Sequence, residues 1–124
     1  MWIASVSGWF SVVVDAQRPP GWMLVRARCR ADIWNLYSAH AATLSSMEPP
    51  TSDERRDYRW RMSISKTDWV QLAARLAQMV DYPNFKSAVH RRADQANKSV
   101  PYMDIWTTMH RVQLVEGPEA PQSP

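Results

Sequence analysis

The sequence predicts an α+β fold, in which an antiparallel sheet of about four strands has helices packed on one face. Residues 22–30 and 57–64 alternate apolar and polar side chains with the period of two that is typical of half-buried strands. Residues 69–80 instead repeat apolar side chains at the spacing of an amphipathic helix. A length of 124 residues, with 45% hydrophobic and 22% charged residues, fits one globular domain. The expected order of elements is β-β-β-α-β-α-α-α.

Four segments rich in β-branched and aromatic residues are the expected strands. Trp2–Val6 and Trp9–Asp15 form a hairpin whose turn, Ser7-Gly8, uses the glycine for a positive φ. A Pro-Pro-Gly breaker separates the hairpin from the third strand, Trp22–Arg30, and the fourth strand is Asp57–Ile64. The two faces of the third strand are Val25, Ala27 and Cys29 against Arg26, Arg28 and Arg30, and those of the fourth are Tyr58, Trp60, Met62 and Ile64 against Arg59, Arg61 and Ser63.

Capping residues and apolar stripes predict the helices. Asp32 is the expected N-cap of a helix that runs to about Leu44. Ser65–Asp68 resembles a capping box and starts a helix whose apolar stripe reaches Val80. A short helix follows Asn84, and the last helix is Pro101–Val112. The core residues expected from this last helix are Tyr102, Ile105, Trp106, Met109 and Val112.

The chain is expected to form a single domain over residues 1–113. Residues 45–56 contain Ser-Ser and Pro-Pro pairs and predict a loop. Residues 114–124 contain three prolines and no apolar period, so we expect a disordered tail.

Several segments carry a resemblance to other proteins. They are Met1-Trp2, Gly8–Val13, Val25–Arg28 with Asp32, Asp57–Arg61, Asp81–Lys86 and Trp106. On these residues the chain resembles a family of small bacterial and phage proteins to which no activity is assigned. The likeness covers most of residues 1–113, and Asp81–Lys86 is its most distinctive part. The resemblance implies a phage or prophage origin and no functional residue.

Arginine alternation is the most suggestive chemical feature, since 12 of the 15 basic residues are arginines and the net charge is +3. If the third and fourth strands are neighbours, their arginines project from one sheet face, and Trp22 joins them by the same period. An arginine fork engages phosphate with two hydrogen bonds, and a basic sheet face with aromatic residues is typical of some single-stranded nucleic-acid binders. The alternative is a solvated face offset by nearby acids such as Asp53, Glu54 and Asp57. The candidate residues for binding an anion or a partner are Arg26, Arg28, Arg30, Arg59, Arg61 and Trp22.

Catalytic and metal-binding motifs are not recognisable in the sequence, so we expect no cofactor and no metal. Cys29 is the only cysteine, which excludes a disulfide within the chain and favours a reducing cytoplasm. We expect it to be a buried strand residue, although basic neighbours can activate a thiol. The three histidines lack the spacing of metal ligands, and His40 is expected to be a hydrogen-bonded core residue. The apolar stretch Met1–Val14 lacks the basic start of a signal peptide, and no stretch reaches the ~20 apolar residues of a membrane span.

Three hypotheses for function remain open. The first is a non-enzymatic protein-binding module, such as a phage-encoded modulator of a host factor or a homodimer, because seven tryptophans are many for this length and exposed ones form apolar patches. The second is nucleic-acid or nucleotide binding through the arginine-bearing face. The third is an enzyme that uses Cys29 or a histidine, and it comes last because no local motif marks it.

Overall fold

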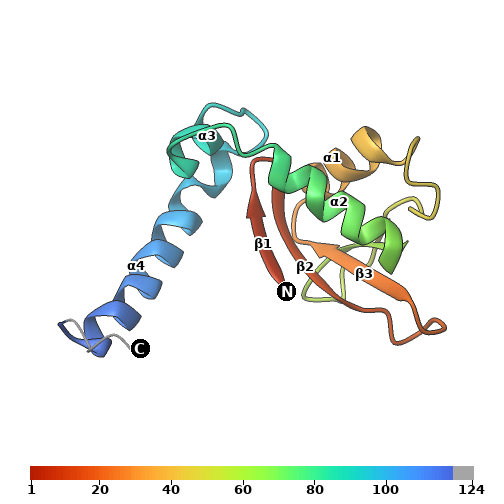
Figure 1. Cartoon of the computed structure of the whole chain (residues 1–124), viewed down its shortest axis with the longest axis horizontal. Coiled ribbons are helices and arrows are strands. Elements are labelled where there is room, and N and C mark those ends of the chain that lie inside the picture. The colour runs from red at the N-terminus through yellow and green to blue at the C-terminus, as the bar shows by residue number, and fades with distance from the viewer. Residues whose placement is uncertain (119–124) are drawn as a thin grey trace, which may run out of the picture. The chain divides into compact units, whose positions relative to one another are not determined.

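The computed structural model describes residues 1–118, and these fall into two compact units. The first unit is Met1–Pro83 and the second is Asn84–Pro124, of which residues 84–118 are described. The prediction of one domain over residues 1–113 stays a prediction, and the boundary between the two units lies at Pro83. Each unit is shown in Figure 1 and has its own packing.

The first unit is built on an antiparallel sheet, as predicted. Its strands are β1 (Trp2–Ser5), β2 (Gly8–Val14), β3 (Trp22–Ala27), β4 (Thr51–Ser52) and β5 (Trp60–Ser65). They lie in the order β1-β2-β3-β5-β4, and every neighbouring pair is antiparallel. The expected fourth strand is β5, and the extra strand β4 is a two-residue pairing contributed by the segment that we expected to be a loop. The α+β class is therefore confirmed.

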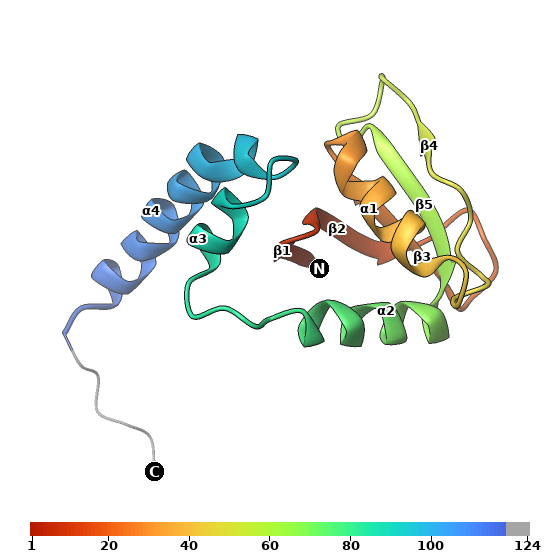
Figure 2. The same cartoon turned by 90° about the horizontal axis from the view of Figure 1, so that it is seen from above.

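Two helices, α1 (Arg30–His40) and α2 (Lys66–Gln78), cover one face of this sheet, as Figure 2 shows. Alternation along the strands turns every second side chain toward them. Burial of this apolar surface is the main term that stabilises the unit. The buried core consists of Phe10, Val12, Val25, Ala27, Ile33, Leu36, Leu44, Met47, Met62, Ile64, Trp69, Leu72 and Leu76.

The turn between β1 and β2 requires a glycine. The two turn residues are Val6 and Ser7, one position earlier than predicted, and Gly8 opens β2 with φ of 151°. A Cβ atom at position 8 would lie 2.4 Å from the Cγ atom of Asp32. The hairpin thus approaches α1 closely enough that only glycine fits.

Asp32 is buried and lies within the first turn of α1, so the prediction that it is the N-cap is wrong. The N-cap position belongs to Cys29, because β3 ends at Ala27 and the helix begins at Arg30. Cys29 is half-buried there, and not a buried strand residue. The Asp32 carboxylate instead accepts a 3.1 Å hydrogen bond from the backbone N–H of Trp9. This contact ties α1 to β2.

Helix α2 begins as the sequence predicts. The Ser65 side chain accepts a 3.2 Å hydrogen bond from the backbone N–H of Asp68. The Asp68 carboxylate turns to the preceding loop, where it accepts hydrogen bonds from the backbone N–H and the hydroxyl of Ser46 at 3.0 and 2.5 Å. These bonds hold the pKa of Asp68 below its ordinary value. The helix ends at Gln78, so Val80 lies beyond it and is exposed.

The second unit consists of α3 (Phe85–His90), a 3-10 turn η1 (Ala96–Lys98) and α4 (Ser99–Glu116). Phe85 and Tyr102 pack with ring centroids 5.3 Å apart, and Tyr102 is buried. The prediction of burial is wrong for Ile105, Trp106, Met109 and Val112, which are 40–60% exposed. Within the described part of this unit the six-residue helix α3 is too short to cover them.

The predicted disordered tail begins too early, because residues 114–116 belong to α4. Residues 119–124 of that predicted tail lie outside the described part of the chain.

Candidate nucleic-acid interface

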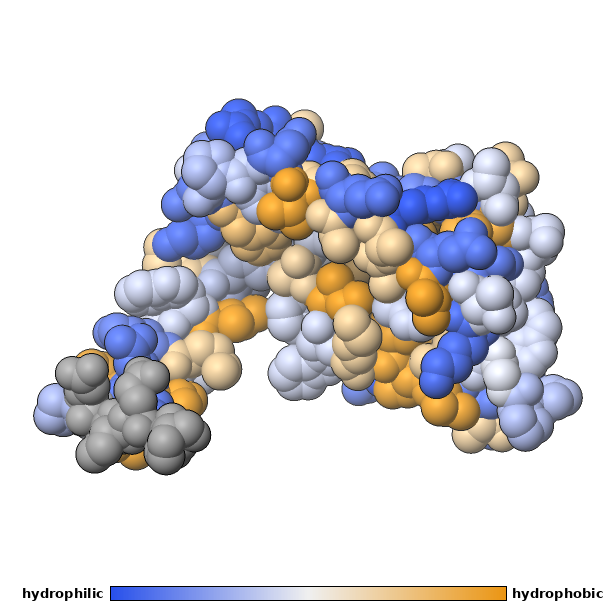
Figure 3. Space-filling model, in the orientation of Figure 1, coloured by the Kyte–Doolittle hydropathy of each residue, from blue (hydrophilic) through white to orange (hydrophobic). Residues whose placement is uncertain are grey.

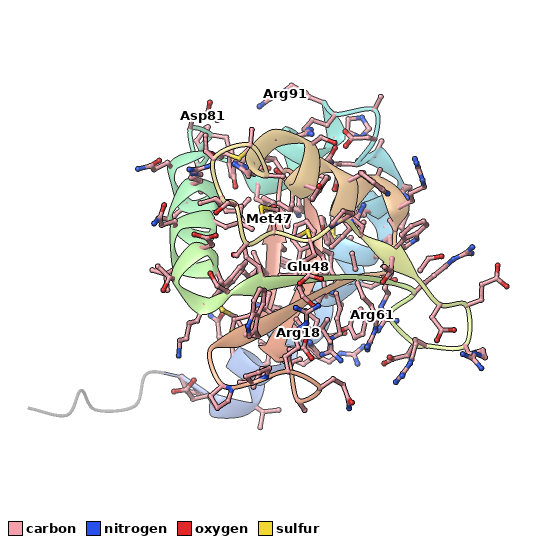
Figure 4. The ribbon with its side chains drawn as sticks, turned by 90° about the vertical axis from the view of Figure 1, so that its right-hand side faces the viewer. Arg18, Met47, Glu48, Arg61, Asp81 and Arg91 are labelled. Carbon is pink, nitrogen blue, oxygen red and sulfur yellow. The ribbon has the colours of Figure 1, made fainter. Side chains whose placement is uncertain are left out.

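The strand register assembles one row of side chains across the open face of the sheet. Neighbouring partners along it are Trp2 and Ser11, Ser11 and Arg26, Arg26 and Arg61, and Arg61 and Thr51. We call these five residues the cross-strand row. Because β3 and β5 are adjacent, the condition on which the predicted arginine face depends is met. Figure 4 shows Arg61 on the side of the strands away from α1.

Arg26 is held in place by two contacts on this face. One guanidinium nitrogen donates a 2.7 Å hydrogen bond to the hydroxyl of Ser11. Its Cζ atom lies 4.7 Å from the ring centroid of Tyr58. The Nε atom of Arg26 is buried and has no hydrogen-bond partner within the described chain. The side chain is therefore oriented, and part of its donor capacity is unused.

Tyr58 joins Arg26 to a second arginine. The Cζ atom of Arg28 lies 4.1 Å from the Tyr58 ring centroid, and its Nη1 atom donates a 2.7 Å hydrogen bond to the backbone carbonyl of Asp57. Sequence alternation predicts Tyr58 on the apolar face with Trp60, which is wrong because β5 begins only at Trp60. Tyr58 precedes the strand and is 5% exposed beneath the two guanidinium groups. It fixes their positions by cation–π contact.

Arg61 has no polar partner anywhere in residues 1–118, and its Nε atom is buried. Neither Arg26, Arg28 nor Arg61 forms an ion pair with any carboxylate of those residues. Arg26 and Arg61 are direct cross-strand partners, an arrangement in which like charges destabilise a sheet. The row therefore concentrates positive charge without an internal counterion.

Two tryptophans that are not among the predicted site residues lie on the same face of the sheet as these arginines. Trp2 is 71% exposed at one end of the row, and Trp9 lies diagonally from it on the same face. Their ring centroids are 5.8 Å apart with planes inclined at 48°. A two-residue turn at either Val6-Ser7 or Ser7-Gly8 puts both rings on one face. The hairpin pattern alone could thus have found them.

Three of the predicted site residues do not join the cluster. Arg59 pairs with Glu54 at 3.1 Å, as the solvated-face alternative predicts. Arg30 is the first residue of α1, where its Cζ atom lies 5.6 Å from the ring of Trp34, because strand alternation stops at Ala27. Trp22 lies on the open face at the other end of β3, four positions from Arg26. Arg18 stacks over it at 4.7 Å and is itself paired with Glu48.

A second surface lies on α4 of the other unit. Ile105, Trp106, Met109 and Val112 recur at helical spacing and are all exposed. Figure 3 shows apolar residues at the surface along this helix. Lys86 of α3 lies 5.4 Å from the Trp106 ring, and His110 stacks on that ring at 5.1 Å. Beyond these contacts the apolar stripe faces outward.

Residues 1–118 contain no group of three His, Cys, Asp or Glu side chains placed to hold a metal ion. The prediction that His40 is a core residue is wrong, because it is half-buried, but it is hydrogen-bonded as expected, with its Nδ1 atom 3.3 Å from the Arg75 guanidinium. Burial and that positive charge lower its pKa. None of the helices within residues 1–118 combines the length and apolar character needed to cross a bilayer.

Comparisons with protein-family models, with curated proteins and with solved structures found no match to this chain. The resemblance to small bacterial and phage proteins therefore stays a prediction.

Proposed function

We propose that this chain is a binding protein that engages nucleic acid through the open face of its sheet. The observation that carries the proposal is the direct pairing of Arg26 with Arg61, two guanidinium groups with no carboxylate partner among residues 1–118. Like charges on neighbouring strands lower the stability of the fold, so stability alone does not explain this pairing. A negatively charged ligand that binds both arginines would explain it.

Phosphate is the anion whose geometry suits this cluster best. Guanidinium groups bind phosphate through parallel N–H donors. Three such groups, those of Arg26, Arg28 and Arg61, lie on one face of the sheet. Tryptophans at the end of the same row add flat surfaces that a simple anion site does not need. The lone cysteine favours a reducing compartment, where nucleic acid is abundant.

The test is the salt dependence of binding. Fluorescence anisotropy of labelled RNA and DNA oligonucleotides, titrated with the full chain at several salt concentrations, should give a linear fall of log affinity with log salt. The double variant Arg26→Gln/Arg61→Gln should bind more weakly and should lower the slope by about 0.7 for each phosphate contact that it removes from a single strand.

A control variant removes a single positive charge at a position away from the row. Arg111 is exposed on α4, so Arg111→Gln removes a like charge from another surface. It should leave affinity and salt slope close to those of the unmodified chain. Salt-independent binding, or equal losses in Arg111→Gln and the double variant, would contradict the proposal.

Protein binding is the second candidate function, and the exposed stripe of α4 favours it. A described unit of about 35 residues is too small to bury much apolar surface by itself. Helices of this kind gain most of their stability from packing of an apolar face. The partner is a host protein or a second copy of the chain, and a phage-encoded modulator of a host factor is one form of this proposal.

The protein-binding candidate is tested by substitution within the stripe. Met109→Glu should abolish capture of a discrete protein from nuclease-treated lysate at high salt, or should convert a dimer to a monomer in light scattering. Thr107→Glu adds the same charge outside the apolar stripe and serves as its control. If both variants behave like the unmodified chain, the stripe is not a binding surface.

A further inference from the structure

We infer that the open sheet face takes single-stranded nucleic acid in preference to duplex, with a base stacked on Trp2 and phosphate groups over Arg26 and Arg61. This inference rests on the proposed function. It adds the class of nucleic acid and assigns separate roles to the aromatic and the basic ends of the cross-strand row.

The aromatic end suits unpaired bases. Trp2 is 71% exposed, so its indole presents a ring face or edge that the protein itself does not cover. Trp9 lies 5.8 Å away at an inclination of 48°, so it flanks the Trp2 ring without forming a parallel stack with it. Bases that are free of a partner strand can stack on such rings, whereas paired bases inside a duplex cannot without being unstacked.

The basic end lies within reach of the same strand. Trp2 and Arg26 are two strands apart, which corresponds to about 10 Å across the sheet. Ser11 lies between them, is 1% exposed, and accepts a hydrogen bond from Arg26 through its hydroxyl. The row therefore orders its chemistry across the sheet as aromatic, hydroxyl, guanidinium, guanidinium and the hydroxyl of Thr51. A strand laid along the row meets a stacking surface and then two phosphate contacts.

Tyr58 is a positioning residue in this arrangement. Its ring is 5% exposed and lies 4.7 and 4.1 Å from the guanidinium carbons of Arg26 and Arg28. It is therefore not available to stack on a base. Its effect on binding acts through the two arginines, so Tyr58→Leu should weaken the phosphate contacts without changing the contribution of Trp2.

We expect the site to bind nucleic acid without base-sequence specificity. Within the described residues it offers ring faces and guanidinium groups, which contact every base and every phosphate alike. Modest preferences should follow stacking strength and backbone flexibility alone. Oligonucleotides of equal length and different composition should therefore bind within about one order of magnitude.

The experiment compares a labelled oligothymidylate with a duplex of equal length by fluorescence anisotropy, with intrinsic tryptophan fluorescence recorded in parallel. We expect tighter binding of the single strand. Trp2→Ala should lower the single-strand affinity about 5- to 150-fold, while Trp2→Phe should recover most of that loss. Neither Trp2 variant should change the salt slope. Val100→Ala, which removes an exposed apolar side chain from α4 outside its apolar stripe, should bind like the unmodified chain.

The outcomes separate this inference from the proposed function. Equal affinity for duplex and single strand, or unchanged affinity in Trp2→Ala beside a loss in Arg26→Gln/Arg61→Gln, overturns the inference and leaves nucleic-acid binding standing. The inference is also overturned if heparin, a polyanion without bases, displaces the labelled single strand as effectively as an unlabelled single strand does. No binding of any nucleic acid at low salt overturns both. Thermal unfolding of each variant confirms that the row was tested in a folded protein.

Discussion

The two faces of the sheet in Met1–Pro83 alternate residue by residue along the same strands, yet their surroundings differ. On one face Phe10, Val25 and Ile64 are fully buried beneath α1 and α2. On the other, Arg26 and Arg61 lie side by side with unpaired buried Nε atoms. The apolar side chains of the covered face stabilise the folded protein, whereas the adjacent like charges of the open face destabilise it. This contrast is the observation on which the proposal of a binding role for the open face rests.

The largest expected effect comes from the covered face. Leu72→Ala on α2, at a position with no exposure, should lower the free energy of unfolding by about 2–5 kcal/mol through lost burial and a residual cavity. Val70→Ala on the same helix is its control, because Val70 is 58% exposed and should change stability by less than about 0.5 kcal/mol. Urea denaturation measures both. Similar losses at the two positions would break the distinction between covered and exposed surfaces.

The next effect comes from the turn that joins β1 to β2. Gly8→Ala should cost about 1–3 kcal/mol, because its Cβ atom would overlap the Asp32 side chain at a positive φ. Gly21→Ala also has a positive φ, of 96°, but no atom lies within 4 Å of its Cβ position. The difference between the two variants in thermal unfolding isolates the overlap. A smaller cost in Gly8→Ala than in Gly21→Ala would contradict this account.

A substitution on the open face is expected to change the free energy of unfolding by a smaller amount and in the opposite direction. Arg61→Gln removes one of two like charges that face each other, and it should raise the free energy of unfolding by about 0.2–1 kcal/mol. The same variant should bind nucleic acid more weakly, so stability and affinity should move in opposite directions. Chemical denaturation and anisotropy on one preparation measure both. A loss of stability would assign Arg61 to the structural framework instead.

The smallest effect concerns pH. Hydrogen bonds from Ser46 lower the pKa of Asp68 from its ordinary value of 3.8, so the folded state binds this proton less tightly than the unfolded state. The resulting stabilisation is complete above the unfolded value and is lost as pH falls through the lowered one. Ser46→Ala should flatten the acid limb of the stability profile, whereas Ser45→Ala should not. An identical acid limb in both variants would contradict the assignment.

The sheet and its helices could be predicted because they depend on local periodicity. Alternation in residues 22–27 and 60–65 and the stripe of α2 depend on which side chains face the core. Ser65 was found as an N-cap because capping needs only neighbouring residues. The prediction that Asp32 is an N-cap is wrong because its partner, the Trp9 backbone, lies 23 positions away. Residue type alone did not distinguish a cap from a tertiary hydrogen bond.

About half of the candidate site could be predicted for the same reason. Arg26 and Arg61 follow from alternation inside strands, whereas Arg30 was lost where β3 ends. Tyr58 lies outside β5, in a loop, and its position under two guanidinium groups could not be predicted because loops have no periodic sequence pattern. The exposure of α4 could not be foreseen, because an apolar stripe looks the same in sequence whether or not another element covers it.

The contact between Gly8 and Asp32 links two positions that are far apart in the sequence. A methyl group at the first cannot coexist with the present carboxylate at the second, since only 2.4 Å separates that Cβ position from the Asp32 Cγ atom. In sequences descended from a common ancestor these positions should change together or not at all. A glycine at the position of Gly8 should accompany an acid or amide at the position of Asp32, and a larger residue there should appear only with a smaller partner. Coupled inheritance of this pair would mark the hairpin–helix junction of this fold.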